Sequence, residues 1–152
     1  MNLGNQDDGA DGMALVFQNL GNEIFDSCDG GGLGYRCLSE YFAVELDTNQ
    51  NPGEIYSDHI QVVSTEKGAL SNMTALENIE TGNNFAFRVT WDTSNSTLKV
   101  YLGGSLRLTL GISSISDQLP GNPDTAYFGF TAATGGRGNT QIVCVPEQEV
   151  YI

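Results

Sequence analysis

The chain has 152 residues, with 19 acidic against 6 basic residues and a formal net charge of −13 at pH 7. So acidic a protein lacks the positive surface that nucleic acids and anionic membranes require, which argues against both as partners. The length predicts one domain with a sizeable core. No stretch is long and apolar enough to predict membrane insertion, and the first residues do not resemble a signal peptide.

The first third of the chain predicts one strand between long loops. Residues 1–12 are polar and rich in glycine, whereas Met13 to Gln18 is a short apolar run that predicts a buried strand. Residues 19–40 predict a loop, which Cys28 and Cys37 bracket at its glycine-rich part. We expect their Cα atoms to lie within about 7 Å, close enough for a disulfide. Two free thiols remain the alternative.

A strand that ends in two carboxylates organises the middle of the chain. Apolar residues alternate with others from Phe42 to Asp47, which predicts a strand with one buried face. Glu45 and Asp47 then share a face, where a divalent cation would relieve the repulsion between their carboxylates. The polar loop that follows adds oxygen donors, which suit Ca²⁺, and the only histidine, His59, which suits a transition ion such as Mn²⁺. The spacing therefore predicts a two-metal site.

The rest of the chain predicts further strands and no long helix. His59 to Ser64 resumes as a strand, and residues 71–82 are irregular. Alternation from Phe85 to Asp92, with Phe85, Phe87, Val89 and Trp91 on one face, begins a meander that continues over 98–102 and 106–110, with a Gly103-Gly104 hairpin turn between these two strands. Ala126 to Ala132 and Thr140 to Val145 predict two more strands, and Cys144 is expected to be buried on the last one. The pattern indicates a sandwich of roughly ten strands.

Four ordered motifs between residues 10 and 136 resemble those of the L-type (legume-like) lectins, in particular their bacterial relatives. They are Ala10-Asp11-Gly12, the glycine run from Gly30 to Tyr35, the Glu45-x-Asp47 strand with its loop, and Gly129 to Gly136. The resemblance implies an all-β, concanavalin-like jelly-roll sandwich of two antiparallel sheets over residues 1–152, with a short N-terminal strand. It also implies a cis peptide bond before Asp11, as is frequent in the family.

The resemblance implies which residues bind metal and which bind sugar. The implied metal ligands are Glu45, Asp47, the Asn49 carbonyl, Asn51, Glu54 and His59, with Asp58 as the substitute for Glu54. The implied sugar-binding residues are Asp11, the Gly31 backbone, Asn51, Asn49, Gly136 and Arg137. Asn49 stands where the family has an aromatic ring that stacks on sugar. Tyr56 and Tyr35 are the two candidates to supply that ring.

The implied function is a metal-dependent carbohydrate-binding lectin module without catalysis, binding a glycan as part of a secreted or cell-surface adhesin; an oligomer is possible. One alternative is a structural or cell-adhesion sandwich whose metal only rigidifies loops. A second is a glycoside hydrolase of the β-glucanase type, which needs a third acid in the pattern E-x-D-x-x-E. Gln50 occupies that third position, which argues against an enzyme.

Overall fold

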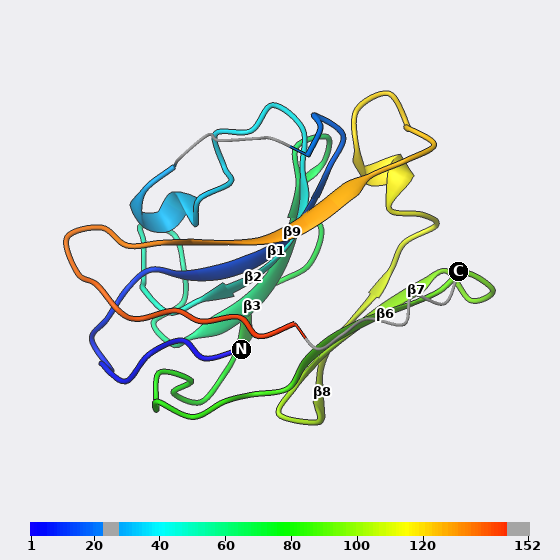
Figure 1. Cartoon of the computed structure of the whole chain (residues 1–152). Helices are drawn as coiled ribbons and strands as arrows, with labels where there is room; N and C mark the ends of the chain where they lie inside the picture. Colours follow the sequence, from blue (N-terminus) through cyan, green and yellow to red (C-terminus); the bar gives the residue numbers. More distant parts are fainter. Residues whose placement is uncertain (23–27, 146–152) are drawn as a thin grey trace.

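The computed structural model describes residues 1–22 and 28–145, which form two antiparallel β-sheets (Figure 1). The larger sheet has the strand order β4-β3-β2-β1-β9, with β5 also paired to β3, and the smaller sheet has the order β6-β7-β8. The strands are β1 Gly12–Gln18, β2 Phe42–Asp47, β3 His59–Ser64, β4 Gly68–Ala69, β5 Thr74–Ala75, β6 Phe87–Asp92, β7 Thr97–Leu102, β8 Ser105–Gly111 and β9 Tyr127–Ala133. Helical structure in the described ranges is limited to two 3₁₀ turns, η1 Gly30–Gly32 and η2 Ser116–Gln118. The prediction of an all-β sandwich with two antiparallel sheets is confirmed.

Strand β2 lies between β1 and β3 and is buried on both faces. On one face, its apolar residues pack in the core against apolar residues of β7; these are Phe42, Val44, Leu46, Leu98, Val100 and Leu102. On the other face, Ala43 packs with Leu33 and Tyr35. The prediction of a single buried face is therefore wrong, because the segment that follows Cys28 covers the second face.

The hairpin between β7 and β8 follows the sequence pattern closely. Leu102 pairs with Ser105, so Gly103 and Gly104 form a two-residue turn. Both glycines have positive φ, at 59° and 82°. Residues with positive φ at both central positions give the turn whose twist suits adjacent antiparallel strands.

The prediction of a strand from Thr140 to Val145 is wrong. The segment forms one isolated bridge, in which Asn2 and Ile142 exchange two backbone hydrogen bonds of 2.8 Å. Because the N-terminal partner contributes a single bridging residue, no continuous ladder forms along the described part of this segment. Cys144 is exposed rather than buried for the same reason.

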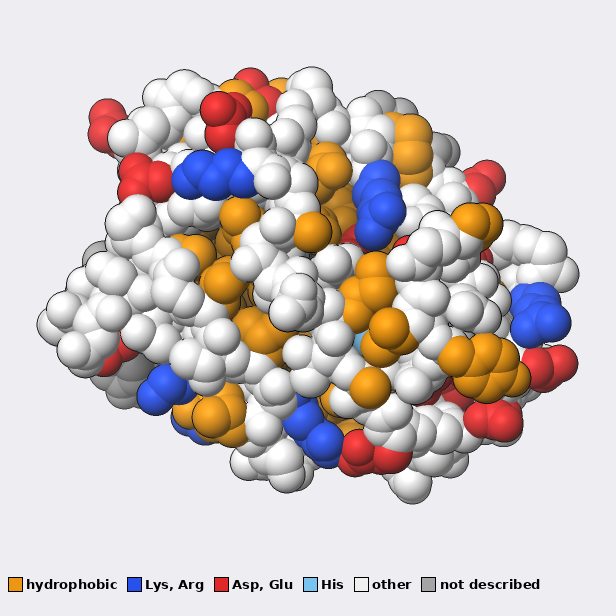
Figure 2. Space-filling model, turned by 180° about the vertical axis from the view of Figure 1, so that it is seen from behind, with side chains coloured by type: hydrophobic (Ala, Val, Ile, Leu, Met, Phe, Trp, Pro, Cys, Tyr) orange, Lys and Arg blue, Asp and Glu red, His pale blue; other side chains and the backbone are white. Residues whose placement is uncertain are grey.

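An apolar cleft of about 440 Å³ opens between the two sheets. Its walls include Leu15, Phe17, Phe87, Val89, Phe128, Phe130 and Cys144. Trp91 also lines it and is 36% exposed. The alternation on this strand indicates one buried face, but Trp91 is not buried there, because β6 is an edge strand of the smaller sheet. Figure 2 shows hydrophobic side chains exposed toward the centre of the rear face and acidic side chains near its rim.

Among the described residues, no helix is long and apolar enough to cross a membrane.

Candidate functional site

Strand β1 begins at the end of the larger sheet where β2 and β9 finish, and the adjoining loops meet there (Figure 1). The strand register pairs Gly12 with Asp47 on one side and with Ala133 on the other. The backbone of Asp11 is held between the same neighbours: its N–H donates to the Ala133 carbonyl at 2.9 Å, and its carbonyl accepts from the Thr48 N–H at 3.0 Å. The peptide bond between Ala10 and Asp11 is cis, as expected. Asp11 is therefore fixed where the three strand ends meet.

The Asp11 side chain is buried with one oxygen unpaired. Its Oδ1 accepts a 3.3 Å hydrogen bond from the Asn49 amide, whereas its Oδ2 has no partner among the described residues. Burial raises the pKa of this carboxyl, the Asn49 hydrogen bond opposes that rise, and the charge of Glu54 adds to it. Because a buried acceptor without a partner is costly, Oδ2 is well suited to accept a hydrogen bond from a ligand hydroxyl.

The glycine loop, which we define as residues 28–37, lies against this carboxylate. The Gly30 N–H donates to the Thr134 carbonyl at 3.2 Å. A Cβ on Gly31 would come within 2.6 Å of Asn51 Nδ2, and one on Gly135 would come within 3.2 Å of Asp11 Oδ2. A side chain at Gly31 would therefore displace the Asn51 amide, and one at Gly135 would crowd the Asp11 carboxylate. The structure thus brings together Asp11, Gly31 and Asn51, three of the residues expected to bind sugar.

A disulfide between Cys28 and Cys37 closes the glycine loop. Their Cα atoms are 5.5 Å apart, so the predicted proximity is confirmed. The constraint keeps Gly30 and Gly31 close to Asn51 and to the loop after β9.

Two further expected sugar-binding residues line a neighbouring cleft of about 640 Å³. Arg137 and Asn49 line it together with Tyr56, which is 90% exposed. Gly136 has open space where a side chain would project. Tyr35, by contrast, is fully buried and cannot stack on a ligand. Of the two candidate rings, Tyr56 alone is accessible.

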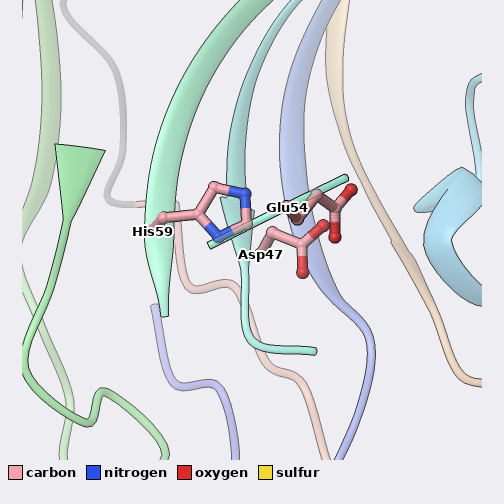
Figure 3. A group of neighbouring side chains, drawn as sticks. All are labelled: Asp47, Glu54 and His59. Atoms are coloured by element: carbon pink, nitrogen blue, oxygen red, sulfur yellow. The ribbon is translucent and has the colours of Figure 1, made fainter. Parts of the chain in front are cut away.

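Asp47, Glu54 and His59 form a cluster suited to a cation (Figure 3). One potential ligand atom from each residue lies within 4.8 Å of the other two. Asp47 and His59 are paired across β2 and β3, and Glu54 reaches them from the connecting loop. The Ser57 carbonyl lies 3.2 Å from His59 Nδ1 and can only accept a hydrogen bond. In the neutral tautomer that donates this bond, Nε2 keeps the lone pair that can bind a cation.

The electrostatics of Asp47 also favour a cation. Its Oδ1 accepts from the Asn49 N–H at 2.9 Å, and its Oδ2 is buried without a partner in residues 1–22 and 28–145. Burial, followed by repulsion from the Glu54 and Glu45 carboxylates, raises the pKa of Asp47 to about 7 against the Asn49 hydrogen bond. A divalent cation supplies the missing positive charge, so the donor set fits one.

Asn49, Asn51 and Asp58 have different places around this cluster. The Asn51 backbone N–H donates to Glu54 Oε2 at 2.6 Å, and its side-chain amide donates to the Asn49 carbonyl at 3.2 Å. Asn51 thus links Glu54 to the Asn49 carbonyl. Asp58 instead accepts a 2.8 Å hydrogen bond from the Ile79 N–H. The structure therefore places Glu54, and not its substitute, in the cluster.

Among the described residues, Glu45 is the one expected metal ligand that forms a salt bridge. Its Oε1 accepts from the Tyr35 hydroxyl, from Arg36 Nε at 3.1 Å and from Arg36 Nη2 at 2.8 Å. Its Oε2 is buried without a partner in the described residues. Sequence reasoning missed Tyr35 and Arg36 here, because nothing in their spacing links the loop to this strand.

Comparison with known proteins agrees with the architecture. A family model described as the legume lectin beta-barrel domain matches residues 1–147. A lectin from Bauhinia forficata in complex with GalNAc has a TM-score of 0.67 and 20% identity, over 88% of this chain and 62% of that one. Basic winged bean lectin with Tn-antigen has a TM-score of 0.65 and 25% identity, over 84% of this chain and 54% of that one. The chain thus spans less than two thirds of either lectin, and the expected jelly-roll fold is confirmed.

Proposed function

The chain belongs to the legume lectin beta-barrel domain family, and from this premise we propose that it is a carbohydrate-binding lectin domain without catalytic activity. The observation that carries the proposal is the convergence of Asp11, Gly31 and Asn51, with Asp11 Oδ2 buried and unpaired within the described part of the chain. A carboxylate accepts hydrogen bonds from sugar hydroxyls, and an asparagine amide donates one. Glycine lets the backbone N–H approach the ring.

A divalent cation, Ca²⁺ or Mn²⁺, is the proposed cofactor. It would be held by Asp47, Glu54 and His59, with the Asn49 carbonyl and the Asn51 amide oxygen as neighbouring donors. When bound, the ion supplies positive charge that holds the loop from β2 to β3 in place. Asn51 then stays positioned against Gly31, so sugar binding depends on the metal.

The proposed ligand is a glycan that enters beside Asp11 and extends over the cleft lined by Arg137 and Tyr56. The two similar lectins hold GalNAc and Tn-antigen, so N-acetylgalactosamine is the first probe to use. A secreted or cell-surface location, as part of an adhesin, is supported by the Cys28–Cys37 disulfide, since such bonds persist in oxidising compartments.

The test is glycan-array binding with Ca²⁺ and Mn²⁺ present, after EDTA treatment, and after Ca²⁺ is restored. We expect binding to disappear in EDTA and return with Ca²⁺. Asp11→Ala should abolish glycan binding and leave cation uptake close to that of the parent protein, because Asp11 does not belong to the metal cluster. Asp124→Ala, a change at an exposed loop position, is the matched control and should bind normally.

Two results would contradict the proposal. Normal glycan binding by Asp11→Ala would place the sugar site elsewhere. No binding to any glycan, together with normal cation uptake, would favour a structural sandwich whose metal only stiffens the loops.

A further inference from the structure

Glu45 and Asp47 are two residues apart on β2 but have different surroundings. The geometry assigns them different tasks: Asp47 binds the cation, whereas Glu45 anchors the glycine loop through Tyr35 and Arg36 and is not a metal ligand. This inference rests on the proposed metal site and departs from the expectation that both carboxylates are ligands.

The charge of Glu45 is already compensated within the chain. Arg36 donates two hydrogen bonds to its Oε1, from Nη2 at 2.8 Å and Nε at 3.1 Å, and the Tyr35 hydroxyl donates a third. Glu45 and Tyr35 are fully buried, so water does not weaken the hydrogen bond between them, whereas the Arg36 side chain is partly exposed. The Arg36 guanidinium thus supplies a positive partner for this carboxylate, while its Oε2 has no hydrogen-bond partner among the described residues.

The positions of the ligand atoms support the same division. Donors to one ion, at about 2.3 Å from it, lie within roughly 4.6 Å of one another. Asp47, Glu54 and His59 approach this spacing, and among the described residues no such group includes Glu45. We therefore place the cation on Asp47, Glu54 and His59 rather than on Glu45.

The contacts of Glu45 indicate that it holds the glycine loop in position. The backbone N–H groups of Tyr35 and Arg36 both donate to the Gly32 carbonyl at 3.0 Å, so these two residues are tied directly to η1. Gly31 lies in η1, against Asn51. Holding Tyr35 and Arg36 to β2 thus holds Gly31 in its place. Glu45 and Arg36 act as positioning residues for the sugar site.

The first test compares Glu45→Gln with Asp47→Asn, a matched pair on one strand face. Calorimetric titration of metal-stripped protein with Mn²⁺ and then with Ca²⁺ measures each affinity. We expect Asp47→Asn to lower the affinity at least about tenfold and Glu45→Gln to leave it nearly unchanged. Equal losses in the two variants would overturn the inference, whereas a parent protein that takes up neither ion would refute the proposed metal site itself.

The second test follows the loop directly and does not depend on a known sugar. Amide hydrogen exchange over residues 30–36 is compared in Arg36→Gln and in Arg107→Gln, which removes the partner of the exposed Glu77. We expect faster exchange only in Arg36→Gln, with partial recovery in Arg36→Lys and cation affinity unchanged in all three. Exchange in Arg36→Gln that matches the control would overturn the role of Glu45 as the anchor.

Discussion

The absence of a side chain at Gly31 allows Asn51 to lie close to the glycine loop. A Cβ at this position would lie 2.6 Å from Asn51 Nδ2, closer than the two atoms can approach. Gly31→Ala should therefore push Asn51 or η1 away and weaken glycan binding at least about tenfold, the loss expected for one hydrogen bond to a polar ligand. Titration with the best array ligand measures the change.

Gly138→Ala is the control for this prediction, because nothing lies within 4 Å of the Cβ that it adds. It should bind like the parent protein. If both alanine variants bind equally well, the contact between Gly31 and Asn51 does not shape the sugar site.

Most residues of the candidate site could be predicted from the sequence, because the motifs occur in family order. It also placed Glu54 ahead of Asp58 as the loop acid, and the structure puts Glu54 in the cluster with Asp47 and His59. It could not show that Arg36 pairs with Glu45. That contact depends on how a loop closed by a disulfide folds over β2, and the pattern of side chains along the sequence does not predict it.

The glycine loop is the element most dependent on a covalent constraint. The disulfide joins residues separated by 9 positions in sequence. For a ring of this size, the loss of chain entropy in the unfolded state predicts about 2–3 kcal/mol of stabilisation. A Cys28→Ser, Cys37→Ser double variant should lose about that much free energy of unfolding, measured by urea denaturation with Ca²⁺ present.

The same double variant should also bind glycan more weakly, since Gly31 would be held by fewer constraints. An unchanged free energy of unfolding would show that Glu45, Tyr35 and Arg36 hold the loop without help from the disulfide.

The alternation of apolar and polar residues predicted where the strands lie, but not which of their faces are buried. The meander of β6, β7 and β8 follows the expected ranges closely, although β6 begins at Phe87 rather than Phe85. Burial depends instead on what packs against a strand. β2 is covered on both faces. The described part of the segment with Cys144 pairs only through the isolated bridge between Ile142 and Asn2.

For the whole molecule, we predict an unusual pH dependence of stability in the metal-stripped protein. Burial is the largest cause that raises the pKa of four carboxyls, those of Asp11, Asp47, Asp58 and Glu80. Each therefore holds its proton more tightly in the folded than in the unfolded state. The free energy of unfolding should rise as the pH falls from about 7, the value for Asp47, toward its ordinary 3.8.

Urea denaturation of metal-stripped protein at several pH values between 8 and 5 tests this prediction. Added Ca²⁺ should stabilise the protein at pH 8 and have less effect at pH 5, because metal ligands must lose their protons to bind. A metal-stripped protein that loses stability steadily as the pH falls below 7 would contradict the raised pKa values.

The exposure of Cys144 has a practical consequence. Because Cys28 and Cys37 are bonded to each other, Cys144 is the chain's one thiol available for chemical labelling. It lines the apolar cleft between the sheets, together with residues from β1, β6 and β9. A maleimide dye that responds to polarity, attached under non-reducing conditions, would therefore give one fluorescent reporter per molecule. Its emission would follow the opening of the sandwich on unfolding without any change to the end that carries Asp11 and Asp47.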